Sequence, residues 1–218
     1  VRSRSPWPFL SQTSNFTVPA TDGAVDWLWT GYYILISRAN QVIEEIPNIE
    51  GVDENLRDRL LGQAYFLRAL AYFNLTNIHD NPPLVLEAPK DQEDFFPSNQ
   101  DVTQDMIYDQ VESDLTEAIN GLPLDYGQVS GPDNGHTGRV TLGAAKSLMG
   151  KVKLYRGRPD EALPFFRDVI TSGQYQLFEN YAAIFSQDPS LENANTGRIF
   201  WAEFTQSENA VFNWGGDP

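Results

Sequence analysis

The sequence of 218 residues contains no cysteine, which excludes disulfide bonds, thiolate nucleophiles and cysteine-based zinc sites. Histidine is almost as scarce: His79 and His136 are the only two, both in loop-like settings, and we expect each to be an ordinary surface histidine. The pair lacks a recognisable zinc spacing, and no nucleophile elbow of a serine hydrolase is present. We therefore expect no catalytic residues, no metal site and no cofactor.

Carboxylates are the one catalytic group that is abundant. Hydrolysis of a glycosidic bond needs two of them close together, and the chain has 30 Asp and Glu residues. Abundance does not place any two side by side, so a hydrolase stays an alternative that turnover of chromogenic glycosides would reveal. We expect a protein that is not an enzyme.

Basic residues are too few for nucleic-acid binding. Fifteen Lys and Arg residues face those 30 acids, which gives a net charge of −15 and an isoelectric point near 4.4. A nucleic-acid-binding surface needs excess positive charge, and an anionic membrane surface would repel this chain. The composition suits a soluble protein with neutral or cationic ligands.

Long apolar runs are also missing. No stretch approaches the roughly 18 consecutive apolar residues of a membrane-spanning helix, and no signal peptide is visible. The chain opens with Val1 instead of methionine and closes on Pro218 in a sequence unlike a natural end. We therefore expect a piece cut from a longer protein.

Helical periodicity dominates the segments that are present. Apolar residues recur every three or four positions in five stretches, which predicts amphipathic helices. The expected helices run from about residue 25 to Pro47, from an Asp53 cap to about residue 80, from a Ser98–Asp101 capping box to Gly121, from Thr141 to Arg156, and from Pro159 to Gly173. Loops are expected at 81–97 and 123–138, and a strand at 199–204.

The last two helices have the spacing of a tetratricopeptide repeat. Small residues at Gly150 and Ala162 allow a close approach, Gly157 makes the turn, and Phe166 fills the groove between the helices. Lys153 stands where such a repeat usually has an aromatic residue. Hairpins of this kind must stack to bury their faces.

These patterns predict a mainly α fold of stacked tetratricopeptide-like hairpins, with long irregular loops and a short C-terminal strand region. Three regions are expected: an N-terminal segment 1–23 with a ligand loop, the helical region 24–174, and the start of an irregular ligand-binding region, 175–218. Within the helices, Arg68 must find a partner or reach solvent. We expect Trp27, Trp29, Tyr32 and Trp201 to pack in the core.

Several segments resemble the SusD/RagB-type family of starch-binding outer-membrane lipoproteins, in the same order along the chain, over roughly residues 25–204. They are Trp27…Tyr32-Tyr33…Arg38-Ala39-Asn40, Gly62-Gln-Ala-Tyr-Phe-Leu-Arg-Ala-Leu-Ala-Tyr-Phe-Asn-Leu75 with Pro83-Leu-Val85, Asp114-Leu115…Leu122-Pro123, Gly138-Arg139-Val-Thr, Leu154-Tyr155-Arg156-Gly157 and Gly173-Gln-Tyr175-Gln-Leu177. Each motif is modest by itself, and the series is specific.

The resemblance implies a nutrient-binding protein of polysaccharide utilisation in Bacteroidota. Such proteins are surface lipoproteins of the outer membrane, held by an N-terminal lipidated cysteine. They lie on a TonB-dependent transporter of the SusC type and capture oligosaccharides, or in some members peptides, for import. The lipobox, its cysteine and the family's C-terminal half are absent here, so membrane attachment would depend on an anchor outside this sequence.

Family members similarly hold ligands with aromatic residues in loops before the first helix and after the last helix of this chain. A flat aromatic ring beside amides or carboxylates suits the C–H face and hydroxyls of a sugar. The expected ligand-binding residues are Trp7, Phe9, Asn15, Phe16, Phe212, Asn213 and Trp214.

One other binding function is compatible with the pattern. A tetratricopeptide-like scaffold can dock peptides or proteins in a superhelical groove lined by polar side chains. The loop aromatics and the inserts at 81–97 and 123–138 favour glycan capture instead.

Overall fold

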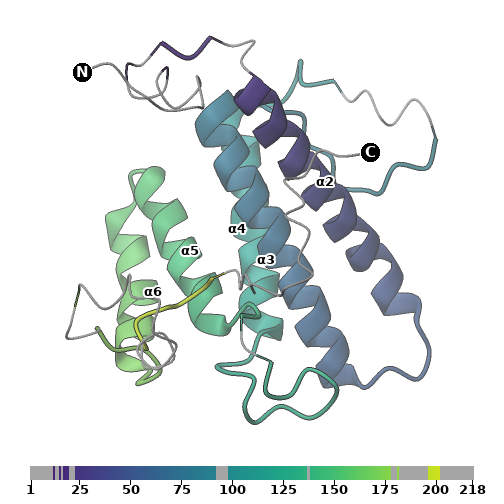
Figure 1. Cartoon of the computed structure of the whole chain (residues 1–218), viewed down its shortest axis with the longest axis vertical. Helices are drawn as coiled ribbons and strands as arrows, with labels where there is room; N and C mark the ends of the chain where they lie inside the picture. Colours follow the sequence, from purple (N-terminus) through teal and green to yellow (C-terminus); the bar gives the residue numbers. More distant parts are fainter. Residues whose placement is uncertain are drawn as a thin grey trace, which may run out of the picture.

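The computed structural model describes residues 12, 15, 17–19, 23–91, 98–136, 138–177, 181 and 196–201. These residues form helices α2 (Gly23–Glu45), α3 (Glu54–His79), α4 (Gln104–Gly121), α5 (Leu142–Tyr155) and α6 (Pro159–Thr171), with a short 3₁₀ turn, η1 (Ile46–Asn48). Consecutive helices run in opposite directions (Figure 1). The expected mainly α fold is confirmed.

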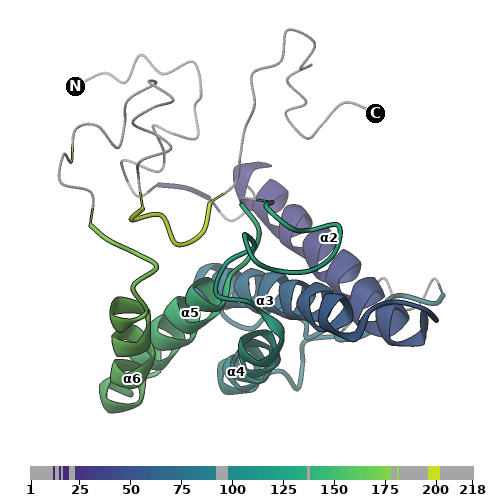
Figure 2. The same ribbon diagram turned by 90° about the horizontal axis from the view of Figure 1, so that it is seen from below.

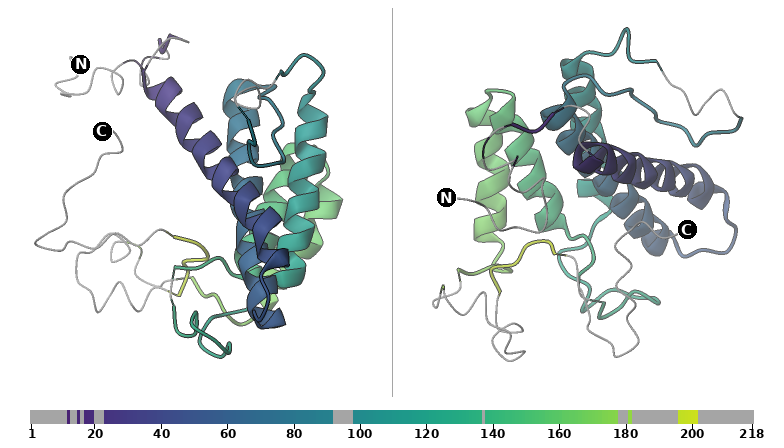
Figure 3. Two further views of the ribbon diagram at one scale, coloured as in Figure 1. Left: turned by 90° about the vertical axis from the view of Figure 1, so that its right-hand side faces the viewer. Right: turned by 45° about the horizontal axis from the view of Figure 1, so that its top comes forward.

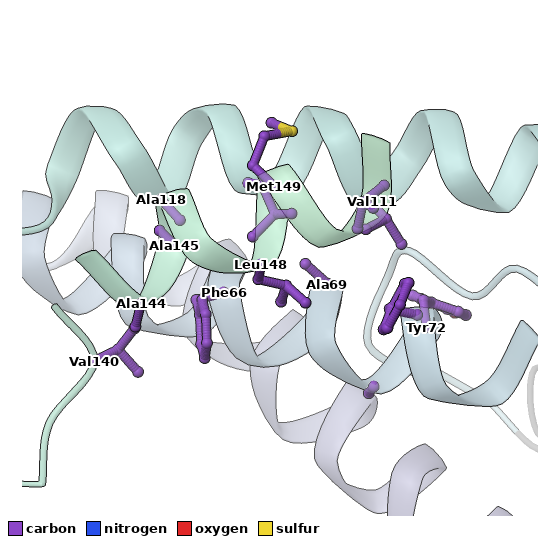
Figure 4. Packing of buried hydrophobic residues seen from close by; sticks show 14 of the residues in the cluster. Phe66, Ala69, Tyr72, Val111, Ala118, Val140, Ala144, Ala145, Leu148 and Met149 are labelled. Atoms are coloured by element: carbon purple, nitrogen blue, oxygen red, sulfur yellow. The ribbon is translucent and has the colours of Figure 1, made fainter. Parts of the chain in front are cut away.

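Helix α3 lies at the centre of the bundle. It packs along α2 on one side and α4 on the other, while α5 pairs with α6 and leans on α4 (Figure 2). Figure 4 shows side chains of α3, α4 and α5 meeting in one apolar layer. The fully buried members include Ala69, Tyr72, Leu75, Ile107, Val111, Leu115, Ala145 and Val152.

Hydroxyl and carboxylate caps set where three helices begin. Asp53, Thr103 and Thr141 each accept a hydrogen bond from the backbone N–H three residues ahead. The expected capping box at Ser98 is wrong, because α4 begins at Gln104, six residues later, with Thr103 as its cap. The Ser98 hydroxyl accepts from the Gln100 N–H instead. The starts of the other four helices and the ends of all five lie within two residues of the expected positions.

The α5–α6 hairpin has the close packing that its spacing predicted. A Cβ placed on Gly150 would come within 2.7 Å of the Phe166 ring, so a larger residue at this crossing would have to displace that ring. Ala162 is buried, and Gly157 makes the turn with a φ of +70°. Lys153, in the place of the usual aromatic, forms ion pairs with Glu112 at 2.7 Å and Glu161 at 2.8 Å.

Arg68 finds its partner in the interior. Its Nε and Nη2 donate to the two carboxylate oxygens of Asp114 on α4, at 2.8 and 2.7 Å. Burial by itself would lower the pKa of Arg68, but the hydrogen bonds to Asp114 raise it above the ordinary value. Nη1 donates to Asn40 Oδ1 on α2 and to the Leu86 carbonyl. One guanidinium therefore joins three helices and a loop.

The segment 83–88 is held in place by side chains of α2 and α3. Tyr33 donates to the Pro83 carbonyl, and Asn40 donates to the carbonyls of Val85 and Glu87. The Tyr72 hydroxyl accepts from the Val85 N–H at 2.7 Å. Backbone groups that form no regular secondary structure are thus satisfied by buried polar residues.

The core predictions for the aromatic residues hold in part. Trp29 and Tyr32 pack against the buried cluster. Trp27 is 54% exposed, so its expected core position is wrong. It lies on the solvent side of α2, because neighbouring positions on a helix point in different directions. Residues 199–201 have no strand conformation, and 202–204 lie outside the described residues.

Replacing Asp114 by alanine is expected to lower the free energy of unfolding by about 3–5 kcal/mol, because the Arg68 charge then stays buried without its partner. Asp168→Ala is the matched control. Its ion pair with Lys146 is also 2.7 Å long, but the Asp168 side chain is 54% exposed, so a loss below about 1 kcal/mol is expected. Urea unfolding measures both, and equal losses would contradict the central role of the buried pair.

Gly150→Ala and Gly31→Ala test the close helix approach. Gly31 lies inside α2 with nothing within 4 Å of a built Cβ, so alanine there should raise stability by about 1 kcal/mol through helix propensity. At Gly150 the new methyl group displaces Phe166, and we expect a net loss of about 1–2 kcal/mol. A gain at both positions, measured by thermal unfolding, would show that the hairpin tolerates a wider separation.

His79 should make the fold sensitive to acid. Its ring meets Trp29 edge-on at 4.9 Å, and burial lowers the pKa of His79 below its ordinary value of 6.5. The unfolded chain therefore binds a proton at His79 more tightly than the folded protein does. The contribution of the neutral, partly buried ring to stability is complete above about pH 6.5 and is lost as the pH falls through the folded pKa. We expect His79→Gln to flatten the fall in stability between pH 7 and 5 relative to the unsubstituted protein. Identical curves for the two proteins would refute this.

Candidate functional site

The candidate site lies at one end of the bundle, where three parts of the chain meet. The loop between α4 and α5, residues 122–141, folds beneath the helices, and residues 196–201 run alongside the start of α5 (Figures 1 and 3). The described residues before α2 lie at the opposite end (Figure 1). Because the loop is long and irregular, something other than regular secondary structure must hold its shape.

A second buried arginine holds the loop. Arg59 on α3 donates from Nε and Nη2 to the two Asp133 carboxylate oxygens, both at 2.8 Å, and from Nη2 to the Ser130 carbonyl at 2.6 Å. These hydrogen bonds from Arg59 hold the pKa of Asp133 below its usual range, against the opposing effect of burial. The turn between Ser130 and Asp133 contains Gly131, which has a φ of +110°.

Tyr126 closes the loop on itself. Its carbonyl accepts from the Gly135 N–H at 2.6 Å, and its hydroxyl donates to the Val140 carbonyl at 3.0 Å. Burial raises the pKa of Tyr126 to about 12, so the phenol stays protonated and keeps donating at neutral pH. The two ends of the loop are therefore joined before any ligand arrives.

A half-open pocket of about 220 Å³ lies between this loop and residues 196–201. It is lined by Asp125, Tyr126, Gly127, Gly135, His136, Gly138, Arg139, Thr141 and Trp201. The Arg198 guanidinium lies over the Trp201 ring, 4.9 Å from its centroid. The hydroxyl of the lining residue Thr141 is 2.9 Å from the Tyr175 hydroxyl.

The pocket wall is almost entirely apolar. A half-buried Trp201 contributes a flat ring to it. A flat aromatic ring in an apolar wall suits the C–H face of a saccharide ring. Among the described residues, no three His, Asp or Glu side chains are grouped to hold a metal ion.

Asn15 is the only predicted ligand residue that can be placed. It is exposed, in a turn where its N–H donates to the Gln12 carbonyl at 3.2 Å, and it is not part of the pocket lining. The other predicted residues, Trp7, Phe9, Phe16, Phe212, Asn213 and Trp214, lie outside the described part of the chain.

The sequence missed the pocket residues for identifiable reasons. The sequence predicts that Trp201 lies in a strand and packs in the core, but Trp201 lines the pocket. Two residues before it, Ile199 packs on the core, and Phe200 meets Phe66 edge-on at 5.2 Å. His136 is exposed as expected, yet it also lines the pocket. The sequence signal was a histidine and an arginine within a glycine-rich loop, and nothing in it showed that Trp201 returns to that loop.

No helix of the described residues is both long and apolar enough to cross a membrane.

The chain matches known proteins in both sequence and structure. Residues 5–154 match the SusD-like family model described as "Starch-binding associating with outer membrane". A SusD-like protein of Bacteroides ovatus is 28% identical over 196 residues, which cover 83% of this chain and 33% of that protein. The chain thus spans about a third of the length of the curated relatives it matches.

Two of the solved structures that share the fold are informative about ligands. A laminarin-binding SusD-like protein has a TM-score of 0.62 and 32% identity, and the match covers 74% of this chain and 35% of that one. A structure with a xylogluco-oligosaccharide has a TM-score of 0.69 and 25% identity, covering 84% of this chain and 36% of that one. The family model covers more than half of the sequence, so the chain belongs to the SusD-like family of starch-binding, outer-membrane-associated proteins.

Proposed function

We propose that the protein captures oligosaccharides at the outer face of the outer membrane and passes them to a TonB-dependent transporter of the SusC type. The family match over residues 5–154 carries this proposal. Two related structures are described as laminarin-binding and as holding a xylogluco-oligosaccharide, which supports a glycan as the ligand class.

The protein acts by binding and not by catalysis. A surface binder needs a preformed, partly open pocket from which an intact ligand can leave again. Arg59 and Tyr126 fix the loop on one side of such a pocket, and Trp201 supplies the apolar surface on the other. Attachment to the membrane is proposed to occur through a lipid at the N-terminus of the complete protein.

A glycan array probed with the complete protein that carries this chain tests the function. Selective binding of oligosaccharides is the expected result, and it also identifies the sugar. Turnover of a chromogenic glycoside would overturn the non-enzymatic part of the proposal. A folded protein that retains no glycan would favour peptide or protein docking on the helical scaffold.

Trp201→Ala tests whether the pocket is the ligand site. Loss of the stacking surface is expected to weaken binding of the glycan found on the array about tenfold, as measured by isothermal titration. Trp27→Ala removes another tryptophan, one that is exposed near the start of α2 and outside the pocket lining, and should leave affinity unchanged. The reverse pattern would place the ligand at the start of α2, near Asn15, and the pocket assignment would be wrong.

A further inference from the structure

The pocket between the 122–141 loop and residues 196–201 presents mostly carbon to a ligand. Its wall is almost entirely apolar, although several lining residues carry polar groups. Trp201 adds a flat ring, and three glycines of the loop add no side chain at all: Gly127, Gly135 and Gly138. The polar groups of the lining must therefore be directed away from the pocket.

Hydrogen bonds within the protein engage the two hydroxyls of the lining. The Tyr126 hydroxyl donates to the Val140 carbonyl at 3.0 Å. The Thr141 hydroxyl caps α5 and lies 2.9 Å from the Tyr175 hydroxyl. Both hydroxyls thus hold the fold together, and a ligand hydroxyl in the pocket gains little from them.

The two charged side chains of the lining are engaged as well. Asp125 accepts from the Gly127 N–H at 2.7 Å, and Arg139 donates from Nη1 to Gln63 Oε1 at 3.1 Å. One acid and one base in the same small pocket give no net preference for a charged ligand. The selective feature that remains is the apolar wall.

We propose that this pocket selects a neutral sugar residue that presents a methyl group in place of a free hydroxyl, as a 6-deoxyhexose or a methyl ether does. The proposal rests on the glycan-capture function proposed above. A methyl group gains from burial against an apolar wall, whereas a hydroxyl gives up its hydrogen bonds to water there. The volume of 220 Å³ is below the roughly 300–1,000 Å³ of sites for drug-sized ligands, so it suits one residue of a longer chain.

Matched pairs of neutral ligands test the proposal by isothermal titration with the complete protein. Oligosaccharides that end in L-fucose are compared with the same oligosaccharides ending in L-galactose, which differ only by the hydroxyl on C6. Agarose oligosaccharides with a methyl ether on O6 of galactose are compared with unmethylated ones, and the glycan found on the array is compared with its methyl-bearing or methyl-free counterpart. We expect the methyl-bearing member of at least one pair to bind about tenfold more tightly, since a buried hydroxyl without a partner costs about this much.

The heat capacity change of binding gives a second measure of the same contact. Burial of apolar surface makes this change more negative, so titrations over a range of temperatures should give the more negative value for the methyl-bearing member. A tighter affinity with an unchanged heat capacity would place the methyl group outside the apolar wall and overturn the proposal.

The outcomes separate the two proposals. Pairs whose members bind equally, or whose hydroxyl-bearing members bind more tightly, would overturn the methyl selection and leave glycan capture standing. No binding by any saccharide would overturn both.

Trp201→Leu and Trp201→Gln provide the residue-level test. Leucine keeps the wall apolar, so it should weaken both members of a pair and preserve most of the ratio of their affinities. Glutamine places an amide in the wall that can pair with a ligand hydroxyl, so the ratio should fall toward one. Trp27→Gln, the same change at an exposed position outside the lining, should alter neither the affinities nor their ratio. Equal ratios in the leucine and glutamine variants of Trp201 would show that the apolar wall does not select the ligand.

Discussion

The bidentate pair of Arg68 and Asp114 is the interaction on which the rest of the fold depends. Both side chains are almost fully buried, at 6% and 2% exposure, so neither charge can turn to water if the other is lost. The same guanidinium reaches Asn40 on α2 and the Leu86 carbonyl. Apolar packing allows helices to slide and rotate, but this network satisfies its atoms in one register of α2, α3 and α4 only.

Helix α3 repeats this device on its other side. Arg59 and Arg68 are nine residues apart, or two and a half helical turns, so they point in opposite directions from the axis. One fixes the segment 83–88 and the other fixes the loop that borders the pocket. A single central helix thereby holds two irregular loops in place, and the candidate pocket inherits its rigidity from that helix.

Local patterns in the sequence predicted the helices well, because apolar spacing and caps such as Asp53 and Thr141 act within a few residues. The hairpin contact of Gly150 with Phe166 was also readable from spacing. The pocket was not, since it needs Trp201 to meet a loop about 65 residues earlier, and no local signal encodes that return. Trp27 shows the same limit: helical spacing predicts which residues share one face of a helix, but not which faces pack against the rest of the protein.

The long sequence separation between Trp201 and the loop that forms the rest of the pocket also affects the order of folding. The helices form contacts with near neighbours in sequence, and Arg59 can bind Asp133 once the first four helices are assembled. Residues 196–201 complete the pocket from much further along the chain, so they should dock last and detach first. A saccharide bound in the pocket would then stabilise the docked position of residues 196–201. It would slow amide hydrogen exchange in that segment more than in the helices.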